Sequence, residues 1–240
     1  MDDWFHHWFD EDYAALYAHR DEAEAGLAVA TALREAPELG QGPVMDLACG
    51  AGRHLLELRR TNPAAFGVDL SPALLRLAPE PLRPHLLQAD MRRLPVKAAS
   101  LSGIAMWFTP FGYFSDEANE ALLHALEELL RPGGALLVDY LNAAQLRATL
   151  VPEDEIERAG IRVRSRRRLE GGRVIKEMEL RRLDTGETRQ ALESVRVYEP
   201  GELTTLASRA GLRLRKALGD YDGGAFTADS PRWIGIFERI

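Results

Sequence analysis

The 240 residues suit one α/β domain with an elaboration, or two small domains. Hydrophobic residues make up 46% and charged residues 28%, as in ordinary globular proteins, and the net charge of −7 argues against a general polyanion-binding protein. Cys49 is the only cysteine, which excludes an intrachain disulfide. The acidic start predicts that there is no signal peptide, and the lack of an apolar run of about 20 residues predicts that there is no membrane partner. A cytoplasmic protein is therefore expected.

The chain begins with aromatic residues and a helix-forming stretch. Six aromatic side chains recur in pairs four residues apart, as on a helical face: Trp4 and Trp8, Phe5 and Phe9, Tyr13 and Tyr17. Residues 21–36 are strong helix formers that end at Pro37. Residues 1–38 are therefore expected to form an N-terminal helical cap.

Short apolar runs alternate with helical patterns between residues 39 and 141. The pattern predicts strands at residues 44–48, 64–69, 85–89, 103–108 and 135–141. Helices are predicted at residues 52–60, after Ser71-Pro72, and at 116–130. Strands that alternate with helices at this spacing are typical of a doubly wound α/β sheet.

The pattern changes after residue 150. Runs at residues 161–169, 173–183 and 187–198 are separated by turns and not by helices, which predicts an antiparallel β-meander inserted after the fifth strand, over residues 151–199. A helix at residues 200–210 and strands at 212–218 and 233–238 then complete the core sheet with residues 200–240. The whole chain, residues 1–240, is expected to be a single domain.

A glycine turn joins the first strand to its helix. In Asp46-Leu47-Ala48-Cys49-Gly50-Ala51-Gly52 the two glycines lack a Cβ, so the backbone amides can approach a ligand closely. Loops at the carboxyl end of a first strand bind nucleotides in doubly wound sheets. A turn that is merely structural is the alternative.

Two acids follow the next strands in register with this turn. Asp69 ends the second strand, where a carboxylate can accept hydrogen bonds from both ribose hydroxyls, and Asp90 ends the third, where it can accept from an adenine amino group. A dehydrogenase fingerprint would need a glycine at residue 55, which is leucine here. The acids and the turn together indicate a site for an adenosine-containing ligand.

With these motifs the chain resembles the class I S-adenosylmethionine (AdoMet)-dependent methyltransferases. The resemblance covers roughly residues 39–141 and also includes residues 104–108 and the Pro132-Gly133-Gly134 turn; Ala48 stands where many members have glycine. It implies a seven-stranded sheet with an antiparallel last strand, and AdoMet as cofactor. The implied cofactor-binding residues are Asp46, Ala48, Cys49, Gly50, Gly52, Asp69, Leu70, Asp90, Met91, Trp107, Tyr17 and Arg20.

The methyl acceptor is expected to be a small molecule that is methylated on nitrogen or oxygen. Residues 107–114 lack the acid- or Asn-Pro-Pro-aromatic signature of many amino-methylases of nucleic-acid bases and protein amides. No catalytic residue is assigned, because the sulfonium donor is already activated and alignment is the main requirement. Candidate acceptor-site residues are Tyr13, Tyr113, Tyr140, Asn142, Tyr221 and Arg232, with the inserted strands beside the pocket.

Other functions remain open. The chain could bind AdoMet and act through a partner without catalysis, or methylate RNA or protein. The arginines at residues 162–168 could contact RNA, but a charged, solvated edge strand is the favoured interpretation. We expect no nucleic acid partner and a monomer or homodimer. We also expect no metal, because His6 and His7 are adjacent while His54, His85 and His124 fall on different elements.

Overall fold

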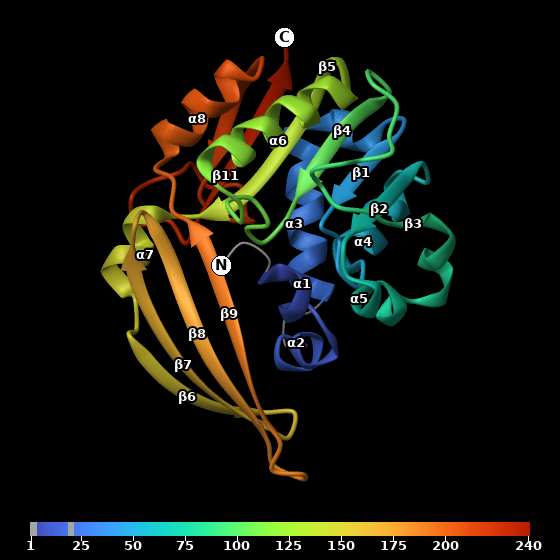
Figure 1. Cartoon of the computed structure of the whole chain (residues 1–240). Coiled ribbons are helices and arrows are strands. Elements are labelled where there is room, and N and C mark those ends of the chain that lie inside the picture. Colours follow the sequence, from blue (N-terminus) through green and yellow to red (C-terminus); the bar gives the residue numbers. More distant parts are fainter. Residues whose placement is uncertain (1–3, 19–21) are drawn as a thin grey trace.

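Two β-sheets organise the computed structural model, which describes residues 4–18 and 22–240 (Figure 1). The seven-stranded sheet has the order β10-β11-β5-β4-β1-β2-β3, and the four-stranded sheet the order β6-β7-β8-β9. Strands of the first are β1 (Val44–Leu47), β2 (Ala65–Asp69), β3 (Leu86–Gln88), β4 (Leu101–Met106), β5 (Leu130–Leu141), β10 (Leu212–Leu218) and β11 (Arg232–Arg239). Strands of the second are β6 (Glu153–Arg158), β7 (Ile161–Glu170), β8 (Arg173–Arg182) and β9 (Thr188–Arg196).

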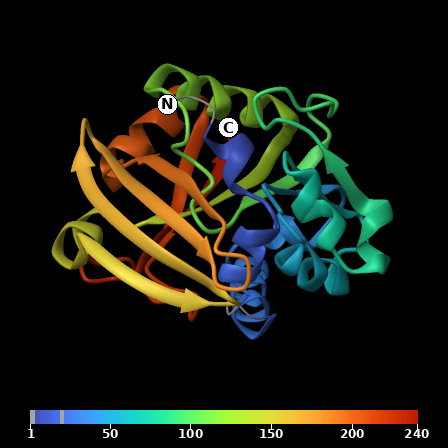
Figure 2. The ribbon, with the colours of Figure 1, turned by 60° about the horizontal axis from the view of Figure 1, so that its bottom comes forward.

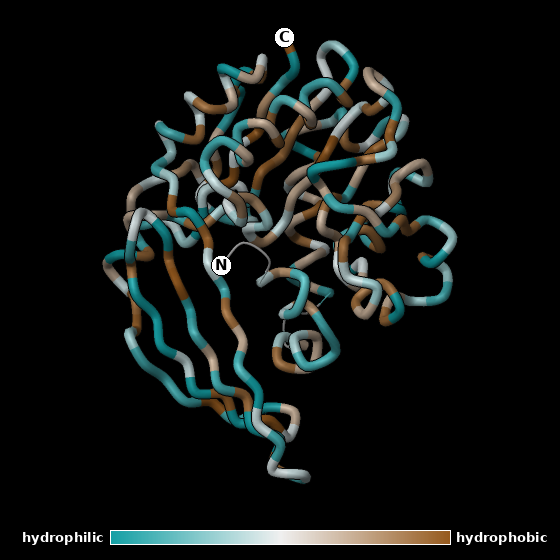
Figure 3. Tube along the Cα trace, in the orientation of Figure 1, coloured by the Kyte–Doolittle hydropathy of each residue, from teal (hydrophilic) through white to brown (hydrophobic). Residues whose placement is uncertain are grey.

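The seven-stranded sheet has the expected topology. Strands β1 to β5 pair in parallel, whereas β11 is antiparallel to both of its neighbours, β5 and β10. The sequence-based expectation of a doubly wound sheet with a reversed last strand is therefore confirmed. Every residue of β1 and β4 is buried, as expected for strands that are covered on both faces; in Figure 3 these central strands are among the most hydrophobic parts of the trace.

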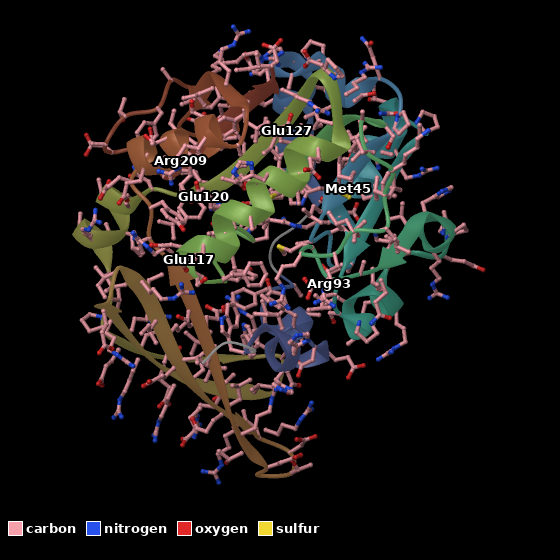
Figure 4. All side chains as sticks on the ribbon, turned by 45° about the horizontal axis from the view of Figure 1, so that its top comes forward. Met45, Arg93, Glu117, Glu120, Glu127 and Arg209 are labelled. Carbon is pink, nitrogen blue, oxygen red and sulfur yellow. The ribbon has the colours of Figure 1, made fainter. Side chains whose placement is uncertain are left out.

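Helices cover both faces of this sheet. They are α3 (Glu22–Glu35), α4 (Arg53–Thr61), α5 (Pro72–Leu77), α6 (Asp116–Leu129) and α8 (Pro200–Arg209), with short 3-10 turns at Pro37–Gly40 and Glu80–His85. Ile104 of β4 packs in the apolar cluster of α6 and α8, and its neighbour Ala105 in that of α3 and α4. Arg209 Nε of α8 lies 2.7 Å from Glu120 Oε1 of α6, so these two helices lie side by side (Figure 4).

Local sequence explains several helix starts. The Ser71 hydroxyl accepts from the backbone N–H of Leu74, with Pro72 at the first helical position, as predicted. Ser115 caps α6 in the same way through Ala118. The structure adds two elements that the sequence patterns did not predict, strand β6 and the short helix α7 (Ala143–Thr149). Strand β5 also begins at Leu130, five residues before the predicted start, because its first residue already pairs with Leu101 of β4.

The four-stranded sheet is antiparallel throughout and has two unlike faces. Along β7, Ile161, Val163 and Ser165 are buried on one face. Arginines alternate with them on the other face and pair with acids of β6, for example Arg164 with Glu155 at 2.5 Å. The run of arginines at residues 162–168 is therefore largely neutralised by acids of the same sheet and its turns.

Two short N-terminal helices, α1 (Phe5–Trp8) and α2 (Glu11–Leu16), lie between the two sheets (Figure 2). Trp8 Nε1 donates to Glu193 Oε1 of β9 at 2.6 Å, and Asp10 pairs with Arg189 at 2.9 Å. The Ser71 hydroxyl donates to the carbonyl of Phe9 at 2.5 Å. We call residues 4–18 the lid, because they bridge the inserted sheet and the core sheet above the strand ends. No helix of the described chain is long and apolar enough to cross a membrane.

Candidate active site

A cavity of about 310 Å³ lies at the carboxyl ends of β1, β2 and β4, with the lid on its other side. This volume is at the lower end of the range for small-molecule sites. The core lines it with Ala48, Cys49, Gly50, Arg53, His54, Asp69, Leu70, Ser71, Asp90, Met91, Trp107 and Phe108, among others. The lid and the loop after β4 add Phe5, Phe9, Tyr13, Tyr17, Pro110, Tyr113 and Phe114. Most of the predicted cofactor-binding residues are thus brought together.

The glycine turn is fixed by its backbone conformation and by the second strand. Ala48, Gly50 and Gly52 all have positive φ, of 61°, 57° and 83°. A Cβ on Gly52 would lie 2.8 Å from Leu82 Cδ1, so a side chain there would also collide. Since left-handed backbone is unfavourable for alanine, Ala48 stores strain at a position where many class I methyltransferases have glycine.

Asp69 ties this turn to the end of β2. One carboxylate oxygen accepts from the backbone N–H of Gly50 at 2.7 Å, and the other from that of Ser71 at 2.8 Å. Burial raises the pKa of Asp69, and these two hydrogen bonds oppose the rise. Each oxygen keeps a second lone pair, so the carboxylate can accept from a ligand hydroxyl without giving up either backbone bond.

Asp90 follows the neighbouring strand, one residue after Ala89, whose N–H donates to the carbonyl of Asp69 at 3.0 Å, and it is held by an arginine. Arg92 donates to both oxygens of Asp90, at 3.0 Å from Nε and 2.5 Å from Nη2. These hydrogen bonds hold the pKa of Asp90 below its usual value. The Arg92 guanidinium also lies over the Phe114 ring, 4.7 Å from its centroid. Asp90 is therefore an ionised, oriented acceptor for an amino group.

Two buried polar atoms of the cavity lining, His54 Nε2 and Trp107 Nε1, have no hydrogen bond of normal geometry, and neither has the Asp46 carboxylate behind the lining. Burial, and next the charge of Asp69, raise the pKa of Asp46 to about 8. Burial lowers the pKa of His54 well below its usual value, so its imidazole is neutral. The His54 and Trp107 rings stack with centroids 4.7 Å apart. Since buried polar groups are normally satisfied, such a cluster indicates a site for a polar ligand or ordered water.

The lid presents aromatic rings to the cavity. The Tyr13 ring packs against Phe9 and Tyr17, with centroids 4.9 Å and 4.7 Å apart. Tyr17 also lies 2.9 Å, hydroxyl to Nζ, from Lys176 of the inserted sheet. Tyr13, Tyr17 and Tyr113 thus line the cavity, and their contacts with cofactor or acceptor stay predictions. The predicted contact Arg20 lies outside the described residues.

Four acceptor-site candidates lie outside the cavity lining, because their polar groups have other partners. Tyr140 donates to the carbonyl of Arg196, and Asn142 caps α7 and donates to the carbonyl of Ser230 at 2.7 Å. Tyr221 and Arg232 both donate to Asp139. These positions correct the expectation that a place near a strand end brings a side chain into the cavity. Asp46 and Gly52 also lie behind the lining and support it.

The Asp139 cluster supports strained backbone after β4. Phe108 and Thr109 have positive φ, of 61° and 64°. Asp139 is fully buried; its carboxylate accepts from the N–H of Phe108 at 2.8 Å and its carbonyl from that of Thr109 at 2.9 Å. Strained non-glycine residues persist where their surroundings hold them and concentrate at functional sites. Arg53, which lies in the first turn after the glycine loop, lines the cavity but was not predicted from the sequence.

Comparison with known proteins identifies the core of the chain. Residues 44–134 match the family model of a methyltransferase domain. The seven-strand order and the glycine turn are those of the class I fold. This chain has the class I methyltransferase fold. The resemblance predicted from the sequence motifs is confirmed.

Solved methyltransferases share the fold over nearly the whole chain. The CcbJ methyltransferase of Streptomyces caelestis is 19% identical, with 97% of this chain and 98% of that chain covered and a TM-score of 0.78. An S-adenosylmethionine-dependent methyltransferase of Clostridium acetobutylicum is 17% identical, with 98% and 97% covered and a TM-score of 0.77. The sugar N-methyltransferase KedS8 of Streptoalloteichus sp. is 23% identical, with 96% and 93% covered and a TM-score of 0.73. Because these matches cover 96–98% of this chain, its lid and inserted sheet are part of the shared fold.

One curated relative is itself described as uncharacterized. An uncharacterized protein of Rickettsia prowazekii is 26% identical over 115 residues, a match that covers 43% of this chain and 44% of that protein. The chain therefore matches less than half the length of this relative.

Proposed function

We propose that this chain is an AdoMet-dependent methyltransferase that methylates a nitrogen or oxygen of a small molecule. The observation that carries the proposal is that Asp69 and Asp90 line one cavity from the ends of two neighbouring strands. Asp69 is bonded to the glycine turn and Asp90 is held ionised by Arg92. A ribose hydroxyl pair and an exocyclic amino group are suitable donors for these two carboxylates.

The chemistry of the remaining groups fits the same cofactor. Asp46, His54 and Trp107 offer a buried acid, a neutral imidazole and a donor without normal partners, close to the turn between β1 and α4. Aromatic rings of the lid and of the loop after β4 suit a sulfonium cation, because a cation is attracted to the face of a ring. AdoMet supplies a methyl group on a cationic sulfur when it is bound.

The protein's own residues then have three roles. The glycine turn and Asp69 orient the nucleoside, the lid rings exclude water, and Tyr113 with Phe114 shapes the wall on the side of β4. Exclusion of water and alignment of the reacting atoms are the main requirements for this displacement. An amine acceptor only has to be neutral when it attacks, whereas a hydroxyl must also lose its proton. This proposal assigns the lining carboxylates Asp69 and Asp90 to the cofactor, which leaves the neutral imidazole of His54 as the base for such a proton and favours an amine.

The likeness to a protein described as a sugar N-methyltransferase supports the same preference. Calorimetric titration with S-adenosylhomocysteine and AdoMet, followed by turnover with a panel of primary amines and phenols, tests the proposal. We expect binding of both nucleosides and methylation of amines in preference to phenols. Absence of binding at millimolar ligand would refute the cofactor assignment, and preferential methylation of phenols would refute the amine preference.

A further inference from the structure

The loop between β4 and α6, residues 107–115, forms one wall of the cavity. Trp107, Phe108, Pro110, Tyr113 and Phe114 of this loop all line it. Three residues of the loop have positive φ, namely Phe108, Thr109 and Gly112 at 96°. A segment with this much left-handed backbone does not keep its shape alone and must be held by its surroundings.

The inserted sheet supplies much of that support through one side chain. Arg173, the first residue of β8, donates to the carbonyls of three successive loop residues: Gly112 at 3.1 Å, Tyr113 at 2.9 Å and Phe114 at 2.9 Å. The same guanidinium donates to the hydroxyl and the carbonyl of Ser194 on β9, at 2.8 Å and 2.7 Å. Its rigid fork of donors suits this task, which an ammonium group cannot perform in the same geometry.

The end of β9 holds the same loop by a second contact. The N–H of Arg196 donates to the carbonyl of Gly112 at 2.8 Å. A Cβ on Gly112 would lie 3.1 Å from both the carbonyl oxygen of Arg196 and the Tyr140 hydroxyl. The strand end therefore packs directly on the loop backbone, and the loop moves only if the inserted sheet moves with it.

Tyr113 connects this contact to the lid. Its carbonyl accepts from Arg173, while its ring packs against Trp4 at 4.8 Å and Phe9 at 5.9 Å between centroids. Tyr113 thus lies between the inserted sheet and the lid and faces the cavity with its ring. The turn at Gly50 and the acids Asp69 and Asp90, at the ends of β1 to β3, belong to the cofactor side of the proposed function.

We infer that Arg173 is a positioning residue through which the inserted sheet sets the shape of the acceptor side of the cavity, with Tyr113 as the specificity-determining side chain. The inference rests on the proposed function in assigning this wall to the acceptor. It gives the inserted sheet a role beyond covering the site. The sheet determines through Tyr113 which acceptors fit, while the ends of β1 to β3, with Trp107 at the end of β4, determine cofactor binding.

Three variants test the inference: Arg173→Met, Arg173→Lys and the control Arg181→Met, which changes an exposed arginine of the same strand. The first measurement is amide hydrogen exchange. Arg173→Met is expected to speed exchange tenfold or more in peptides from residues 107–119 and to leave residues 44–69 unchanged. Arg173→Lys should resemble Arg173→Met, because the fork and not the charge is needed, and Arg181→Met should match the unmodified protein. Unchanged exchange at 107–119, or equal acceleration throughout, would overturn the inference.

The second measurement compares cofactor affinity with acceptor selectivity, to distinguish a residue that positions the acceptor wall from one that only stabilises the fold. Affinity for S-adenosylhomocysteine should stay within threefold in Arg173→Met, while the ratio of kcat/KM for ethylamine to that for cyclohexylamine changes at least fivefold. In a Tyr113→Ala background the same Arg173→Met change should alter that ratio less than twofold, because the two residues act through one wall. If Arg173→Met changed this ratio by the same factor with and without Tyr113→Ala, the role given to Tyr113 would be contradicted. If the unmodified protein binds no S-adenosylhomocysteine, the proposed function fails, while the exchange measurement still decides whether Arg173 holds the loop.

Discussion

Two sides of the cavity are built in different ways. Its floor consists of the glycine turn and the ends of β1 to β3, and its roof consists of the lid, the loop at residues 107–115 and the inserted sheet. On the floor, the decisive bond joins Gly50 to Asp69, which are 19 residues apart, and backbone N–H groups supply it. In the roof, Trp8 bonds to Glu193 across 185 residues, and Arg173 reaches Gly112 across 61. Local motifs and strand order therefore determine the floor, whereas the roof depends on a few side chains that meet only after the whole chain has folded.

This difference separates two functions in one small domain. A floor made of backbone amides and acids can bind the same nucleoside while the roof changes. Tyr17, Tyr113 and the lid rings can vary in shape without disturbing the bonds of Asp69. If the proposed function holds, the roof is the part of the molecule where acceptor choice can evolve, and it should also be the part most sensitive to single long-range contacts.

The largest effect is expected from breaking the lid at Trp8, which is 1% exposed. Trp8→Ala should lower the free energy of unfolding by about 3–5 kcal/mol, because it removes a large buried ring and leaves a cavity. Chemical denaturation measures this. Trp8→Phe keeps most of the ring and loses the bond to Glu193, so its cost should be only about 1–2 kcal/mol. Similar losses in the two variants would show that the hydrogen bond, and not packing, holds the lid.

The floor should respond to pH through Asp46, whose pKa is raised from the ordinary 3.8 to about 8 by burial first and Asp69 second. Between about pH 4 and pH 8 the folded chain keeps a proton that the unfolded chain has lost, so rising pH lowers the free energy of unfolding. Asp46→Asn cannot ionise and lacks this contribution. From pH 5 to pH 8 its stability relative to the unmodified protein should rise by up to about 4 kcal/mol, from 1.36 kcal/mol per pH unit.

The slope is the test, because the asparagine amide changes absolute stability as well. Denaturation curves for the two proteins should diverge as the pH rises from 5 to 8 and run parallel below pH 4. Parallel curves over the whole range would show that Asp46 is ionised in the folded protein at neutral pH.

The affinity for S-adenosylhomocysteine should depend on Asp69 in the floor and not on the hydroxyl of Tyr113 in the roof. Asp69→Ala should weaken S-adenosylhomocysteine binding by about 1–3 kcal/mol through lost charge-assisted bonds to the ribose. Calorimetry measures the change. Tyr113→Phe, a conservative change in the roof, should leave the same affinity within about 0.5 kcal/mol, since the ring remains. Unchanged affinity in Asp69→Ala would remove this acid from the site.

Sequence patterns predicted the floor well because its determinants are local. The predicted strand at residues 212–218 coincides with β10, and the predicted end of β2 at Asp69 is the observed one. The loop from Ala48 to Gly50 lies at the predicted site. Each of these depends on apolar runs, turn glycines or caps that act within a few residues.

The roof could be predicted only in part. Aromatic spacing indicated that Tyr13 and Tyr17 share a helical face, and both line the cavity. The sequence around Tyr140 and Asn142 does not show that their side chains donate to the distant carbonyls of Arg196 and Ser230. Strand β6 was missed because five of its six residues are exposed and charges dominate it, so its sequence lacks the apolar alternation of a half-buried strand.

The smallest effect is expected on the outer face of the inserted sheet, at Arg166. Its side chain is 76% exposed and lies 3.2 Å from Glu153, which is 69% exposed. Arg166→Met should change the free energy of unfolding by no more than about 0.5 kcal/mol, because solvent and salt screen such pairs. Denaturation at low and high salt measures both the size and the screening. A larger loss that disappears in high salt would mean that the arginines and acids of β6 and β7 act as one network. The inserted sheet would then be held by its outer charges as well as by the Arg173 bonds, and the inner contacts alone would not account for its position.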